Sequence, residues 1–280
     1  MDAKRTSLVA EIGCVHGGSL SRAIELIDLA ASSGADAVKS QKRHPHESVP
    51  EHMKTSSHPR PEFSFGSTYL DHRLKLELHV RDHHDMCDHA HMLGIMYGCS
   101  VWDLTSAKEM SSISLDFVKI PSALCTNLKF VDECMRIFYC PVHVSTGMTN
   151  VAEREDLYEF LEKFSHRCVL YHTTSEYPCP FSRLYLNEIP NILSRGFQVG
   201  FSNHGYGIAA DIAAMTLGAR WIERHFVDDR SYPHTDAAAS LEPSGLATLA
   251  RDIKNVSQSL CSRPDIPTEE EIKQMRKLKP

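Results

Sequence analysis

The chain has 280 residues, 42% of them hydrophobic, and a formal net charge of −6. It can bury one large core, whereas its acidic balance and the lack of a basic cluster exclude a typical nucleic-acid-binding protein. Nine scattered cysteines without a CxxC pair argue against a disulfide framework or zinc ribbon. No apolar stretch is long enough for a signal peptide or membrane span. We therefore expect a cytoplasmic protein without membrane contact.

Short apolar runs alternate with amphipathic stretches along the chain. Residues 19–34 and 151–164 have helical periodicity. The runs have the length and composition of strands, and they cover 8–15, 35–41, 95–102, 116–122, 141–147, 168–174, 197–203 and 221–227. Eight strands alternating with helices predict a (β/α)₈ barrel. A doubly wound sheet is disfavoured because no GxGxxG follows the first strand. We expect a single domain over residues 1–280.

Two segments depart from this repeat. Residues 42–70 hold four prolines and little periodicity, so they predict a long loop over the site. The tail after Pro264 is rich in charge, and we expect it on the surface.

Polar residues stand at or near the end of every strand-like run, where a barrel enzyme carries its catalytic groups. Lys39 and Lys119, with several hydroxyls, suit a phosphate and a carboxylate. His204 and His225, on neighbouring strands, suit a divalent metal completed by oxygen ligands. In "WIERHFV" (221–227) we expect His225 to face this metal, with Glu223 or Arg224 lining the mouth.

Other interpretations of these residues stay open. The lysines could reach solvent as ordinary strand-end residues, or one could form a Schiff base. The histidines could be satisfied core residues. The stretch "RDHHDMCDHAH" (81–91) resembles a metal motif, but a solvated helix face is favoured.

The sequence resembles the sialic acid (N-acetylneuraminate) synthase family, which condenses phosphoenolpyruvate with an aldose. The resemblance spans nearly the whole chain in the family's order. It rests on the motifs "VAEIGCVHGGSLSRAIELID", "GADAVKSQ", "FVKIPSA", "VSTGM", "YHTTSEYPCP", "GFSNH" and "IERHF", with Asp236 following.

The resemblance implies roles for twelve residues. The implied catalytic residues are Glu11, Lys39, Lys119 and Asp236. Phosphoenolpyruvate would be held by Lys39, Ser100, Lys119, Ser122, Ser145 and Ser202. The acceptor sugar would contact Glu11, Gln41, Tyr177 and Asp236. His204 and His225 would bind the metal, usually Mn²⁺.

Three departures from the family concern the acceptor. The chain stops at Pro280, without the antifreeze-like domain that usually follows, and Leu124 stands where an acidic residue is usual. We therefore expect an acceptor without an obligatory N-acetyl group, preferably a neutral or otherwise modified aldose. The loop 42–70 is unlike the corresponding loop of the family. It could replace the wall of the sugar site that the antifreeze-like domain usually supplies, through Lys42, Arg43, His44 and His46. These basic residues are compatible with a phosphorylated or carboxylated sugar.

The expected reaction is a metal-dependent condensation of phosphoenolpyruvate with an aldose, giving a 3-deoxy-2-ulosonic acid and phosphate, in a homo-oligomer. The alternatives are a Schiff-base aldolase on the same barrel and a catalytically inactive sugar-binding barrel. Cys14 follows the first strand near the position of a metal-binding cysteine in related octulosonate-phosphate synthases. It could be a third ligand, although a plain buried thiol is favoured.

Overall fold

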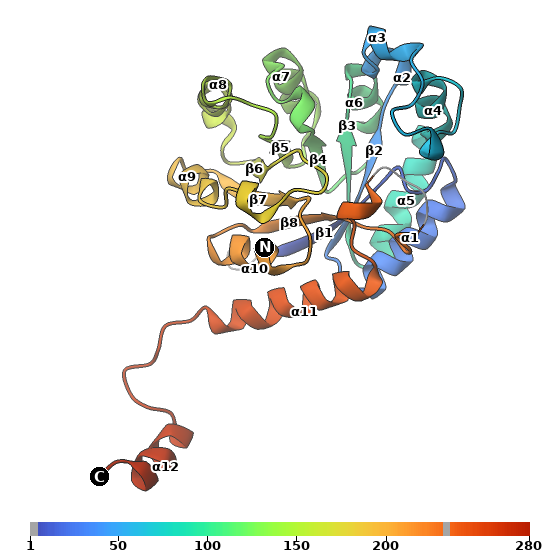
Figure 1. Ribbon diagram of the computed structural model, residues 1–280. Coiled ribbons are helices and arrows are strands. Elements are labelled where there is room, and N and C mark those ends of the chain that lie inside the picture. The colour runs from blue at the N-terminus through green and yellow to red at the C-terminus, as the bar shows by residue number, and fades with distance from the viewer. Residues whose placement is uncertain (1–4, 232–235) are drawn as a thin grey trace.

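The computed structural model describes residues 5–231 and 236–280. In this part of the chain, eight parallel strands close into a barrel in chain order, with helices around it (Figure 1). The strands are β1 (Ser7–Gly13), β2 (Ala37–Lys42), β3 (Met96–Val101), β4 (Phe117–Ile120), β5 (Val142–Ser145), β6 (Cys168–Thr173), β7 (Gln198–Asn203) and β8 (Trp221–His225). The predicted (β/α)₈ barrel is confirmed.

The helices follow the strands, and the connection between β2 and β3 contains additional short ones. They are α1 (Leu20–Ser32), α2 (Pro45–Ser48), α3 (Glu51–Lys54), α4 (Tyr69–Leu76), α5 (Val80–Met92), α6 (Leu104–Met110), α7 (Leu128–Ile137), α8 (Val151–Leu161), α9 (Glu188–Ser194), α10 (Ala209–Thr216), α11 (Pro243–Ser259) and α12 (Glu269–Leu278). Helix α8 begins at a capping box between Asn150 and Glu153, which pairs backbone N–H groups that would otherwise lack acceptors.

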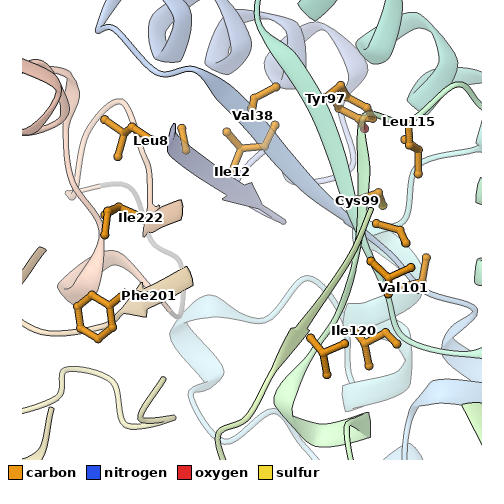
Figure 2. Close-up of a cluster of buried hydrophobic side chains, with 14 of the residues drawn as sticks. Leu8, Ile12, Val38, Tyr97, Cys99, Val101, Leu115, Ile120, Phe201 and Ile222 are labelled. Atoms are coloured by element: carbon orange, nitrogen blue, oxygen red, sulfur yellow. The ribbon is translucent and has the colours of Figure 1, made fainter. Parts of the chain in front are cut away.

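Strand alternation sorts the core into two layers. Side chains that point out of the barrel pack against the helices, and Figure 2 shows Leu8, Val38 and Ile222 among those of this outer layer. Side chains on the opposite faces of the strands point into the barrel, because successive residues of a strand alternate. There Val9, Ala37, Phe117, Val169, Tyr171 and Trp221 form a separate apolar cluster. The buried His143 ring packs within this cluster, against Phe117, Tyr171 and Trp221. The polar residues of the candidate site lie above it, toward the carboxyl ends of the strands.

The long second connection is more ordered than the sequence predicts. It contains α2, α3 and a short 3₁₀ helix, η1 (Pro61–Phe63), before α4 begins at Tyr69. Part of it lies over the barrel mouth, because Arg43, Phe63 and Phe65 line the cavity described below. Residues of this connection thus reach the cavity, and the connection is not structureless.

The end of the chain is exposed, as predicted. Helix α11 buries Leu246, Leu249 and Ile253, whereas α12 buries none of its residues and lies away from the barrel (Figure 1). Among the described residues, no helix is long and apolar enough to cross a membrane.

Candidate active site

A cavity of about 290 Å³ opens at the carboxyl ends of the strands. All twelve residues predicted for the site line it: Glu11, Lys39, Gln41, Ser100, Lys119, Ser122, Ser145, Tyr177, Ser202, His204, His225 and Asp236. They come from positions as distant in sequence as Glu11 and Asp236. The structure therefore brings the whole predicted set together.

Strand register explains why these residues converge. Glu11 pairs with Lys39 and with His225 across adjacent strands, and Ser100 pairs with Lys119. Paired residues of neighbouring parallel strands share a face, so each of these side chains points into the barrel.

Two buried lysines and two buried carboxylates form the floor of the cavity. Lys39 is ion-paired with Glu11 and donates a hydrogen bond to Ser100 Oγ at 2.7 Å. Lys119 Nζ donates to Glu223 Oε1 at 2.7 Å. The same oxygen lies 3.9 Å from Lys39 Nζ, so Glu223 links the two lysines.

The pKa values follow from burial and from these ion pairs. Burial opposes charge on Lys39, but Glu11 and Glu223 outweigh it and raise the pKa of this ammonium group. Burial lowers the pKa of Lys119 to about 8 despite the attraction of Glu223. Burial would raise the pKa of Glu223, yet the two lysines hold it at about 2. All three groups are therefore charged at neutral pH.

Serine hydroxyls surround the lysines. Ser202 Oγ donates to Glu223 Oε1 at 3.1 Å. Because Gly147 has no side chain, two serine hydroxyls can lie close to its backbone. A Cβ atom at this position would lie only 2.8 Å from Ser122 Oγ and 2.6 Å from Ser175 Oγ. Hydroxyl donors around two ammonium groups can bind a phosphate.

His204 directly follows β7, and His225 is the last residue of β8. Both line the cavity, and their ring centroids lie 5.4 Å apart. His204 Nδ1 donates to the carbonyl oxygen of Thr174 at 2.9 Å, which leaves Nε2 with its lone pair for a ligand. Burial and the His225 ring lower the pKa of His204 to about 3, so it is neutral, as metal coordination requires. The pair fits a divalent cation whose remaining ligands are oxygens. Within residues 5–231 and 236–280, no group of three His, Cys, Asp or Glu side chains could hold one alone.

The residues predicted for the acceptor border the histidines and β1. The ring of Tyr177 packs against His204, with centroids 4.0 Å apart. Asp236 Oδ2 lies 3.8 Å from His225 Nδ1. Gln41 Nε2 donates to Glu11 Oε1 at 2.9 Å, so the acceptor side is joined to the lysine network.

Residue Arg224 does not line the mouth, contrary to one of the predictions for β8. It points outward and is buried, where it pairs with Asp211 at 2.9 Å and donates to the carbonyl oxygens of Gly205 and Gly207. Glu223 faces inward but lies in the floor. Alternation along β8 explains both positions: Glu223 and His225 share the inner face, and Arg224 has the outer one.

Four further expectations need correction. Cys14 lines the cavity and is only half-buried, so it is not a plain buried thiol; a role as a third metal ligand stays a prediction. Leu124 lies beside a second cavity and is not among the described residues lining the first, so the side chain at this position does not line the candidate site.

The stretch 81–91 is not wholly solvated. It belongs to α5, and His83 is buried, with Nδ1 2.9 Å from the Tyr97 hydroxyl. Of the basic residues 42–46, only Arg43 lines the cavity; Lys42 points outward to Glu77 at 3.4 Å.

Several cavity residues were not predicted. Arg73, Trp102, Thr173 and Ser175 line it together with Phe63 and Phe65. Thr173 could have been found from alternation along its strand. Arg73 lies in α4, where strand alternation gives no signal.

Comparisons with known proteins agree with this geometry. Residues 26–264 match the model of the NeuB family. The chain is 32% identical to the N,N'-diacetyllegionaminic acid synthase of Campylobacter jejuni, over 92% of this chain and 78% of that protein. It is 29% identical to the human N-acetylneuraminate-9-phosphate synthase, over 91% of this chain and 71% of that protein.

Solved structures share the fold. An N-acetylneuraminic acid synthetase from Leptospira borgpetersenii superposes with a TM-score of 0.81 at 24% identity, covering 99% of this chain and 93% of that one. A truncated 3-deoxy-D-arabino-heptulosonate 7-phosphate synthase from Thermotoga maritima superposes with a TM-score of 0.68 at 13% identity, covering 92% of this chain and 88% of that one.

Proposed function

Because this chain belongs to the NeuB family, we propose that it is a synthase that condenses phosphoenolpyruvate with an aldose, in a metal-dependent reaction that gives a 3-deoxy-2-ulosonic acid and phosphate. The observation that carries the proposal is one cavity lined by two buried lysines, several serine hydroxyls and two neighbouring histidines. The lysines and hydroxyls suit the negatively charged phosphate and carboxylate of phosphoenolpyruvate. The histidines suit a metal ion that would polarise the aldehyde of the sugar.

The lysines and serines would bind phosphoenolpyruvate. Lys39 and Lys119 would neutralise its phosphate and carboxylate, while the hydroxyls of Ser100, Ser122, Ser145 and Ser202 would fix its orientation. Their ion pairs with Glu11 and Glu223 hold both ammonium groups in place before substrate arrives. Such preorganisation lowers the reorganisation needed during the reaction.

The acceptor would lie between Gln41, Tyr177 and the histidines. A divalent ion held by His204 and His225, Mn²⁺ being our first choice, would act as a Lewis acid toward the aldehyde oxygen. Glu11 and Asp236 are the carboxylates that reach the acceptor side, where they would exchange protons with sugar hydroxyls and water.

The bond changes balance as follows. C3 of phosphoenolpyruvate forms a bond to the aldehyde carbon, whose oxygen takes a proton. Water adds to C2, and the C2–O bond to phosphate then breaks, which leaves a keto group at C2. The chain's residues contribute by holding C3 against the aldehyde carbon and by stabilising the charge on the departing phosphate.

One observation favours a second candidate, the Schiff-base aldolase. The lowered pKa of Lys119, about 8 because of burial, makes a neutral amine more accessible than in an ordinary lysine. Borohydride reduction with pyruvate would trap a lysine adduct, detectable by mass spectrometry. The synthase predicts no adduct, and Lys119→Arg would supply the control for its position.

Phosphate release tests the proposal. Purified chain with Mn²⁺ and phosphoenolpyruvate is offered mannose, N-acetylmannosamine, each 6-phosphate and pentose phosphates. We expect phosphate release that requires an aldose, with one ulosonic acid formed per phosphate. An inactive sugar-binding barrel would give binding without release, and such a result across the panel would refute the proposal.

A further inference from the structure

Two arginines stand at the rim of the cavity, above its lysine floor. Arg43 follows β2 and Arg73 lies in α4, and both line the cavity. Arg43 is only 8% exposed, and its guanidinium lies 3.4 Å from the centre of the Trp102 ring. Arg73 Nη2 donates to the Tyr69 hydroxyl at 3.0 Å. Stacking and hydrogen bonding thus hold both guanidinium groups in fixed positions.

Neither arginine is ion-paired within residues 5–231 and 236–280, unlike the two lysines. Arg43 Nη2 donates to Gln41 Oε1 at 3.2 Å, and its Nε has no partner among the described residues. The nearby Glu77 accepts from the backbone N–H of Arg43, at 2.9 Å, and from Lys42. The Arg73 guanidinium also lies 5.4 Å from the centre of the Tyr69 ring, and its Nη1 lies 3.9 Å from Cys14 Sγ.

The two guanidinium groups also repel each other. Burial and the charge of Arg73 together lower the pKa of Arg43 to about 10. Burial opposes charge on Arg73 as well, but Cys14, Tyr69 and Asp236 outweigh it and raise its pKa. A charge buried without an ion pair, such as that of Arg43, is costly, so an anion that reaches both guanidinium groups would stabilise it. A planar guanidinium suits the oxygens of a phosphate or a carboxylate equally.

We propose that Arg43 and Arg73 form an anion subsite for the acceptor, so that the preferred aldose carries a phosphate or carboxylate away from its aldehyde end. This inference rests on the proposed function. Because Lys39 and Lys119 already supply charges for phosphoenolpyruvate, the arginine pair serves the second substrate. The relatives named above include a synthase of a 9-phosphate and one whose product name carries no phosphate. This chain's own residues therefore decide the charge of its acceptor.

Steady-state kinetics with matched acceptors test the subsite. Mannose, mannose 6-phosphate and mannuronate, and N-acetylmannosamine with its 6-phosphate, are compared at saturating phosphoenolpyruvate and Mn²⁺. We expect kcat/KM to be at least tenfold higher for an anionic acceptor than for its neutral counterpart. The phosphate and carboxylate arms distinguish which anion is preferred.

Variants locate the effect. Arg73→Gln should lower kcat/KM for the anionic acceptor by roughly 30-fold or more, because charge-assisted contacts are lost, while the KM for phosphoenolpyruvate changes less than threefold. Arg43→Lys keeps the charge but not the planar group, and should give an intermediate loss. Lys75→Gln removes an exposed charge from the same helix, outside the cavity, and should change neither constant.

The outcomes separate the two proposals. An active enzyme that prefers neutral acceptors, or an Arg73→Gln variant that loses phosphoenolpyruvate affinity instead, would overturn the subsite and leave the synthase intact. Absence of aldose-dependent phosphate release with every acceptor would overturn both. Circular dichroism and thermal melts of each variant exclude loss of fold as the cause.

Discussion

Burial opposes the positive charge of Lys119 and lowers the pKa of its ammonium group to about 8. It touches Glu223 on one side and lies over the Tyr171 ring, 4.2 Å from its centre, on the other. A cation in such a dry position interacts strongly with an anionic substrate. Single substitutions here should therefore separate the two substrates.

We predict that Lys119→Met raises the KM for phosphoenolpyruvate roughly 30- to 150-fold, since one charge-assisted contact is worth about 2–3 kcal/mol. The acceptor KM should change little. Lys42→Met is the matched control, because Lys42 also lies near the carboxyl end of a strand but pairs with Glu77 outside the cavity. An unchanged KM for phosphoenolpyruvate with impaired acceptor binding would overturn the assignment.

The pKa of Lys119 also predicts a pH dependence. This group is protonated below pH 8 and loses its charge as the pH rises through about 8. The kcat/KM for phosphoenolpyruvate should therefore fall above pH 8, tending to tenfold per pH unit. In Lys119→Arg this alkaline limb should be absent, because arginine stays charged. A flat profile in the wild-type enzyme would contradict the role of Lys119.

For the metal, we predict that a chelator abolishes activity and that Mn²⁺ restores it. His225→Ala should lose bound metal, measured by elemental analysis, together with turnover, while its far-ultraviolet circular dichroism is unchanged. His44→Ala, an exposed histidine at the same end of the barrel, is the control. Full activity of His225→Ala, or of the metal-free enzyme, would remove the metal from the reaction.

At the scale of elements, the strands were the most predictable part. The run 95–102 contains β3 at Met96–Val101, and the run 221–227 contains β8 at Trp221–His225. Apolar and β-branched residues define such runs locally. Alternation along them then predicts that polar side chains such as Lys39 and Lys119 point inward. Ser122, Tyr177, His204 and Asp236 lie outside the strands, and the roles of all twelve residues that line the cavity come from the family resemblance.

The remaining features depend on contacts that no local pattern encodes. Glu223 pairs with Lys119, on a strand four positions away around the barrel. Arg73 reaches the cavity from a helix that follows a proline-rich connection, where neither strand nor loop composition gives its direction. Its partner Tyr69 likewise begins a helix, although the sequence pattern around it predicts a loop.

The connection between β2 and α4 presents an aromatic wall. Phe65 lines the cavity yet is 42% exposed, as expected for a side chain that a substrate would cover. We predict that Phe65→Ala raises the acceptor KM roughly 5- to 30-fold, or about 1–2 kcal/mol for lost apolar burial, with the KM for phosphoenolpyruvate unchanged.

Phe181 supplies the control for this wall. It is also exposed, at 59%, but is not among the described residues that line the cavity. Phe181→Ala should leave both KM values as they are. An effect of Phe65→Ala on phosphoenolpyruvate alone would show that the wall serves the other substrate.

At the scale of the whole molecule, stability should reside in the barrel and in α11. Deleting residues 265–280 removes α12, which buries no side chain, so the Tm should fall by less than about 2 °C. Leu249→Ala in α11 should cost about 2–5 kcal/mol, because Leu249 is fully buried. Calorimetry compares the stability of the two variants with that of the full chain. A large loss of Tm in the deletion variant would show that α12 packs against the barrel.

The homo-oligomer expected from the sequence stays a prediction, and light scattering on the purified chain tests it. An acceptor without an obligatory N-acetyl group also stays a prediction. Leu124 no longer supports this prediction, because that residue lies beside the second cavity. The kinetic comparison of N-acetylmannosamine with mannose decides it.

The central claim is that C2 of phosphoenolpyruvate loses its bond to oxygen while C3 joins an aldehyde. Phosphoenolpyruvate labelled with ¹⁸O in the bridging position reports this directly, by the isotope shift of the released phosphate in ³¹P nuclear magnetic resonance. We predict that the label leaves with phosphate, and only when aldose and Mn²⁺ are present. Label retained in the organic product, or release that does not require an aldose, would contradict the account.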